Sequence, residues 1–182
     1  MSASVTPIPV YRIDLGLPPE ERYAQLASDF ALRMRAVMPL YEEILSLLLL
    51  YRPLIFLAKL FVRCFLRRVW DPEQTREIRA ISRVAGIDLS LVVVLNTLLD
   101  SLLGCTSGAI TVRSGHAVGS PGRLLHFRTL DWGMPALRDL LVVLEFVDSS
   151  QGEPESVLAR SITYAGFVGS LTGARYGASR LS

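Results

Sequence analysis

The feature that most constrains this chain of 182 residues is a change of character at Gly104-Cys105. Before it, apolar residues recur at helical spacing, and prolines and acidic residues mark helix starts. After it, β-branched residues, glycines and turn signals dominate. The expected fold class is therefore α+β, with a helical region at 1–104 that opens on a β segment, and a β-rich region at 105–182.

The expected elements follow from proline, glycine and the apolar pattern. The helical region should contain one edge strand at 6–14 and helices at 18–37, 39–51, 53–69, 71–86 and 88–102. The β-rich region should contain a hairpin of strands at 106–112 and 124–127, followed by strands at 140–147 and 156–164. The chain shows no internal repeat.

Composition excludes several classes of protein. Hydrophobic residues make up 51% of the chain, which excludes a disordered chain because enough apolar surface exists to offset backbone entropy. The 19 basic and 17 acidic residues give a net charge of +2, so no nucleic-acid partner is expected. Two cysteines cannot build a disulfide framework, and no Cys/His pair has metal-finger spacing. We expect no metal and no cofactor.

The most apolar stretch lies at 44–70. Its longest charge-free run, 44–51, is shorter than the roughly 18 residues of a membrane-spanning helix. Arg52, Lys59, Arg63 and Arg67 would form a basic stripe on a helix beside a broad Leu/Phe face. Such a helix can lie on a membrane surface, or it can be a core helix whose stripe faces water. The N-terminus has no secretory signal pattern, and the compartment stays unknown.

Cys105 stands inside a two-part pattern. A lone cysteine is usually a small buried residue, but here GCTSGAI is followed by a turn-rich connection and then by HFRTLDWG. This pattern resembles the acid ceramidase and N-acylethanolamine acid amidase family of N-terminal-nucleophile (Ntn) hydrolases. Further matching segments are PIPVYRIDLG near the start, Glu77-Ile78-Arg79, Val93-Val94-Leu95-Asn96 with Asp100, and the segment GFVGSLTG at 166–173.

The resemblance implies a specific chemistry. The chain would cleave itself between Gly104 and Cys105, and the Cys105 thiol would then attack the amide bond of an N-acyl lipid of the ceramide or N-acylethanolamine type. The free α-amine of Cys105 would be the base, Arg128 would favour the thiolate, and Asp131 would orient the α-ammonium group. The α-subunit-like fragment 1–104 and the nucleophile fragment 105–182 would stay together as parts of a partial αββα sandwich. Family members often work in acidic organelles.

Two other functions remain open from the sequence. The family's β-rich part continues past the LTG segment, whereas this chain ends at Ser182, so the nucleophile region is expected to be incomplete. The chain could then be a catalytically silent lipid-surface or regulatory relative. A conventional cysteine protease would instead depend on His126.

Overall fold

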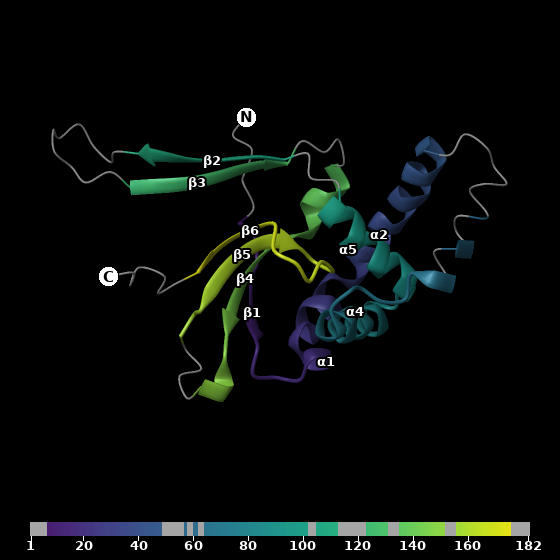
Figure 1. Ribbon diagram of the computed structural model, residues 1–182, viewed down its shortest axis with the longest axis horizontal. Helices are drawn as coiled ribbons and strands as arrows, with labels where there is room; N and C mark the ends of the chain where they lie inside the picture. Colours follow the sequence, from purple (N-terminus) through teal and green to yellow (C-terminus); the bar gives the residue numbers. More distant parts are fainter. Residues whose placement is uncertain are drawn as a thin grey trace.

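The structure is a computed structural model. It describes residues 7–48, 57, 60–61, 64–101, 105–112, 123–130, 135–151 and 156–175. The chain is α+β, as expected: among the described residues the α-helices precede Cys105, and five of the six strands begin at or after it (Figure 1).

The larger sheet has four strands in the order β1-β4-β5-β6. These are β1 (Val10–Asp14), β4 (Leu141–Val147), β5 (Ala159–Tyr164) and β6 (Thr172–Arg175). The expected edge strand is confirmed as β1, which pairs in parallel with β4, whereas β4–β5 and β5–β6 are antiparallel. The sheet is therefore mixed, and β6 lies in a glycine-rich segment for which no strand was expected.

The helices are α1 (Pro19–Arg22), α2 (Ala24–Leu48), α4 (Pro72–Ala85) and α5 (Leu89–Ser101). The expected break before Pro39 is wrong, because α2 continues through that residue. A proline inside a helix removes the hydrogen bond from its own nitrogen and crowds the carbonyl four residues earlier, but a long helix can bend at this point and continue. The helix expected at 18–37 is instead divided at Tyr23, which ends α1.

The signals at both ends of α4 are confirmed in detail. The side chain of Asp71 accepts a hydrogen bond from the Glu73 backbone nitrogen at 2.7 Å and so caps the N-terminus. Gly86 ends the helix in the left-handed conformation with φ of 65°. The start and end expected for α5 also agree with the structure to within a residue.

The helix expected at 53–69 ends earlier than predicted. Leu57, Leu60, Phe61, Cys64 and Phe65 are helical, but the chain from residue 66 to residue 71 is not. In this non-helical stretch the Val69 nitrogen donates to the Thr75 hydroxyl at 3.3 Å, and that hydroxyl donates to the Asp71 carbonyl at 2.8 Å. The other residues of the stretch 49–63 lie outside the described residues.

The core lies between the four-stranded sheet and the helices that cover it (Figure 1). Its members are apolar side chains from β1, α2, α4, α5 and β4. The 3-10 helix η1 (Pro135–Leu140) and the segment after β5 contribute further apolar side chains. The largest fully buried apolar side chains are Ile13, Met34, Ile78, Ile81, Leu140, Leu144, Val92, Val93 and Val142.

The expected hairpin is present as β2 (Cys105–Val112) and β3 (Arg123–Leu130), an antiparallel pair that forms a second sheet. Figure 1 shows it as a separate ribbon beside the four-stranded sheet. Two sheets are thus present, but the packed αββα sandwich stays a prediction. A further 3-10 helix, η2 (Ser149–Gln151), follows β4.

Candidate active site

The hairpin positions the cysteine that the sequence singles out. Cys105 is the first residue of β2 and pairs with Leu130, the last residue of β3. Arg128 pairs with Ser107, so Cys105 and Arg128 are diagonal neighbours on the two strands. Diagonal neighbours in an antiparallel pair lie about 7–8 Å apart on one face, within reach of a long side chain. The backbone thus brings the predicted nucleophile and the predicted cation to one end of the hairpin.

Asp131, the third predicted site residue, lies outside the described residues. It follows Leu130 directly in the sequence, and Leu130 is the residue paired with Cys105. Its role as the acceptor for the α-ammonium group stays a prediction.

His126 is the residue on which a conventional cysteine protease would depend. It pairs with Ala109, four residues along β2 from Cys105. At about 3.3 Å per residue, this places the two backbones roughly 13 Å apart along the hairpin. A thiol and its histidine base must lie within hydrogen-bond reach, about 2.6–3.2 Å between heavy atoms. The register therefore argues against a Cys105–His126 pair.

The helix that leads to Cys105 is attached to the sheet through Asn96. This side chain of α5 is 3% exposed. Its Nδ2 donates to the Val92 and Gly166 carbonyls at 2.9 and 2.8 Å, and its Oδ1 accepts from the Val168 nitrogen at 2.9 Å. From the sequence, Asn96 is recognised only as part of the matching segment Val93-Val94-Leu95-Asn96, which predicts no contact for it.

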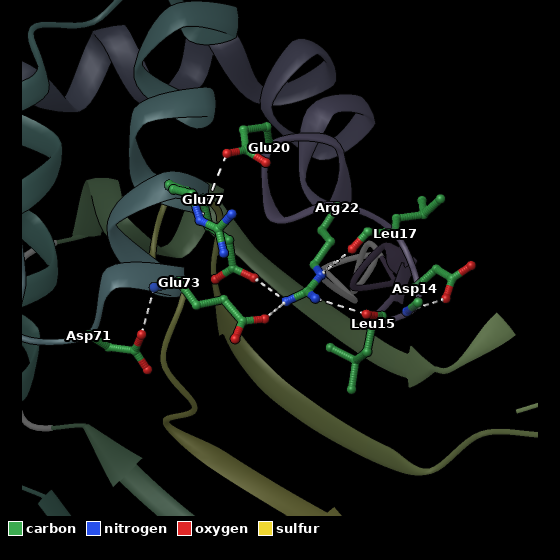
Figure 2. A network of polar contacts seen from close by, with 10 residues as sticks. Asp14, Leu15, Leu17, Glu20, Arg22, Asp71, Glu73 and Glu77 are labelled. Carbon is green, nitrogen blue, oxygen red and sulfur yellow. Dashed lines mark hydrogen bonds and ion pairs between the residues drawn. The ribbon is translucent and has the colours of Figure 1, made fainter. Parts of the chain in front are cut away.

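A second polar cluster is centred on Arg22 (Figure 2). Its Nε donates to the Leu17 carbonyl at 2.9 Å, and its Nη2 donates to the Leu15 carbonyl at 2.8 Å. Its Nη1 pairs with Glu73 and, at 3.0 Å, with Glu77. Arg22 thereby holds the connection between β1 and α1 against α4.

Glu77 is the buried carboxylate of this cluster. Its side chain is 7% exposed, and burial raises the pKa of Glu77, while the Arg22 guanidinium opposes that rise. Sequence reasoning missed the ion pair, although a signal for it exists. Glu77 stands four residues before Ile81, so it lies on the apolar stripe of α4, where a carboxylate needs a partner.

Five apolar side chains of the region 57–70 are exposed, and we call them the apolar patch: Leu57, Leu60, Phe61, Phe65 and Trp70. The rings of Phe61 and Phe65 stack with their centroids 4.7 Å apart. Arg67 and Arg68, between Phe65 and Trp70, are also exposed. Within the described residues, no helix has the length and apolar character to span a membrane.

We find no group of His, Cys, Asp and Glu side chains with metal-binding geometry in the part of the chain that the structure describes. The observations together define an α+β chain in which the candidate nucleophile opens a β-hairpin, directly after a helix that is hydrogen-bonded to the central sheet region.

Comparison with known proteins finds similar proteins for this chain. A family model described as the beta subunit of N-acylethanolamine-hydrolyzing acid amidase matches residues 6–69, which include most of the apolar stretch. Acid ceramidase of Bos taurus is 26% identical over 185 residues, covering 94% of this chain and 44% of the bovine protein. Acid ceramidase of Mus musculus is 28% identical over 193 residues, covering 97% of this chain and 45% of the mouse protein.

These matches support the resemblance to the acid ceramidase and N-acylethanolamine acid amidase family, a family of N-acyl lipid amide hydrolases. The similarity extends over nearly the whole chain. The chain spans less than half of the length of the curated relatives that it matches.

Proposed function

We propose that this chain is an N-acyl-lipid amide hydrolase, or the nucleophile-bearing part of one, that activates itself by cleavage between Gly104 and Cys105. The observation that carries the proposal is the register of the hairpin, in which Cys105 opens β2 diagonally to Arg128. The similarity to acid ceramidases over 94% or more of the chain supports the substrate class.

The self-cleavage needs no group beyond water. The Cys105 sulfur attacks the Gly104 carbonyl carbon, the C–N bond breaks, and the thiol proton goes to the departing Cys105 nitrogen. Water then hydrolyses the thioester, which releases the Gly104 carboxylate and regenerates the Cys105 thiol beside a free α-amine. A glycine before the scissile bond leaves the carbonyl open to attack.

The mature site would combine nucleophile and base on one residue. An α-amine has an ordinary pKa of about 7.7–8.0, so near neutral pH it can take the thiol proton. The thiolate attacks the substrate amide, the amine leaves with a proton, and water hydrolyses the acyl-thioester. Arg128 would stabilise the thiolate by its permanent charge, and Asp131 would accept a hydrogen bond from the α-ammonium group.

The apolar patch would bring this site to its substrate by binding the membrane surface. Phe61, Phe65 and Trp70 present aromatic surface to solvent, and Arg67 and Arg68, which lie between Phe65 and Trp70 in the sequence, are exposed as well. Exposed apolar and aromatic side chains next to basic residues bind the interface of an anionic membrane, where N-acyl lipids reside.

Intact-mass measurement on the purified chain, incubated from acidic to neutral pH, tests the proposal. We expect two fragments divided between Gly104 and Cys105 in the wild type and one uncut chain for Cys105→Ala. Cys64→Ala, which removes the exposed cysteine of the apolar stretch, is the matched control and should cleave like the wild type. Cleavage that persists in Cys105→Ala would contradict the proposal, as would an uncut wild type at every pH.

The apolar patch also favours a second function, that of a catalytically silent lipid-surface module. Flotation with vesicles of phosphatidylserine and phosphatidylcholine separates the two functions when it is combined with the mass measurement. Binding by an uncut wild type, lost in Phe65→Ser, supports the silent module. Leu32→Ser is the control, because Leu32 is an exposed leucine of α2 and not a member of the patch. Binding that is unchanged in Phe65→Ser excludes a role for the patch.

A further inference from the structure

Two segments that the proposed chemistry leaves without a role meet at Asn96. One is α5, which continues from Asn96 to Ser101 before Cys105 opens β2. The other is the connection between β5 and β6, which begins with Ala165 and Gly166 and reaches from the sheet toward the helices in Figure 1. The Asn96 side chain hydrogen-bonds the Gly166 carbonyl and the Val168 nitrogen across 70 and 72 residues of sequence.

The chemistry of this contact requires an amide. The Nδ2 of Asn96 faces two carbonyl acceptors, Val92 and Gly166, while its Oδ1 faces the Val168 N–H donor. These partners also determine which amide atom is nitrogen and which is oxygen. An ionised aspartate would direct negative charge at the carbonyls, and an alanine would leave the buried Gly166 carbonyl and the Val168 N–H without this partner.

The connection that Asn96 holds is itself fixed in place. Gly166 adopts a φ of 95°, and a Cβ built there would lie 2.7 Å from the Met34 Cε of α2 and 3.6 Å from the Leu95 Cδ2 of α5. The Ala165 nitrogen donates to the Leu140 carbonyl at 2.7 Å, and the Phe167 side chain is buried. The connection is thus held in place beside the sheet, and the two hydrogen bonds of Asn96 attach α5 to it.

We propose that Asn96 is a positioning residue for self-cleavage, because it fixes α5, and hence the chain leading to Gly104 and Cys105, relative to the central sheet. This inference rests on the proposed self-cleavage. Nucleophilic attack needs the reacting atoms about 3–3.5 Å apart, and a displacement of about 1 Å by a distant change can cost on the order of 100-fold in rate.

The test compares cleavage rates of the full chain, measured by mass, under conditions in which circular dichroism shows each variant folded. We expect Asn96→Ala and Asn96→Asp to cleave roughly 100-fold more slowly than the wild type at neutral pH. Asn96→Asp should recover as pH falls, because a neutral carboxylic acid again donates one hydrogen bond and accepts another. Asn96→Ala should show no such recovery.

Ser82→Ala is the matched control. Ser82 lies on α4, and the substitution removes a buried hydrogen bond of similar length, 2.7 Å to the Ile87 carbonyl before the start of α5. It should lower stability without slowing cleavage. A folded Asn96→Ala that cleaves at the wild-type rate overturns the inference. If Asn96→Ala does not fold, the dependence of the Asn96→Asp cleavage rate on pH tests the inference instead. A dependence parallel to that of the wild type overturns the inference. An uncut wild type refutes the proposed self-cleavage, and the inference falls with it.

Discussion

The two sheets of this molecule differ in what surrounds them. In the four-stranded sheet, Val142 and Leu144 are fully buried beneath the helices. In the hairpin, Ile110, Val112, Leu125 and Phe127 are 37–52% exposed. Burial of apolar surface is the main stabilising contribution to folding, so the four-stranded sheet should dominate stability. The hairpin carries the candidate nucleophile, so changes there should affect chemistry far more than stability.

The largest expected loss of stability follows from truncating the central strand of the larger sheet. Leu144→Ala should lower the free energy of unfolding by about 2–5 kcal/mol, because it removes buried methyl groups and leaves a cavity beneath the helices. Urea denaturation followed by circular dichroism measures the change. A loss below about 1 kcal/mol would mean that this sheet is not the stabilising centre of the molecule.

The next largest effect is expected at the Arg22 cluster. Arg22→Met should cost about 3 kcal/mol, because it leaves Glu77 buried without its cation and frees the Leu15 and Leu17 carbonyls. Arg76→Met is the matched control, since Arg76 is half exposed and its nitrogen lies 3.9 Å from Glu20. The control should change stability by less than about 1 kcal/mol. Equal effects in the same denaturation assay would refute the structural role of Arg22.

The raised pKa of Glu77 should affect how the stability of the chain depends on pH. Its pKa is raised in the folded state, chiefly by burial, so the folded chain binds a proton more tightly than the unfolded chain does. The stability from this group is present below the ordinary glutamate pKa and is lost as pH rises through the raised pKa. Arg22, Glu73 and Asp71 are the charged groups that act on it.

Glu77→Gln removes this titration. We expect the free energy of unfolding of the variant to fall less steeply between acidic and neutral pH than that of the wild type. Glu20→Gln is the control, because Glu20 is more exposed and pairs with Arg76 rather than with Arg22. A Glu77→Gln curve parallel to the wild type would show that Glu77 titrates normally in the folded chain.

Local signals predicted most of the fold. Asp71, Pro72 and Gly86 mark the ends of α4 by chemistry that acts within a few residues. The parallel pairing of β1 with β4 depends on contacts distant in sequence, which local propensity does not include. The break expected before Pro39 overestimated a local signal, since α2 continues through that residue.

The candidate site likewise combines features set by residues near in sequence with features set by residues far apart in sequence. Cys105 and Arg128 could be selected from the sequence because the motifs that contain them resemble those of a known family, and the predicted hairpin between them is local. The contacts of Asn96 with Gly166 and Val168, and of Arg22 with Glu77, join residues 55 or more positions apart. Only the packed fold brings these groups together, so sequence patterns could indicate at most that Glu77 needs a partner.

One substitution made in both sheets gives the finest comparison of the two regions. Val142→Thr places a hydroxyl on the buried β4, where it should cost about 1–3 kcal/mol for want of a hydrogen-bond partner. Val112→Thr makes the same change on the exposed hairpin, where water solvates the hydroxyl, and should change stability by less than about 0.5 kcal/mol. Both unfolded variants gain the same solvated hydroxyl. The difference between their denaturation midpoints therefore measures the cost of burying that hydroxyl in the folded chain. A comparable cost at Val112 would mean that the apolar face of the hairpin is covered in solution, and that the hairpin contributes to the folded core.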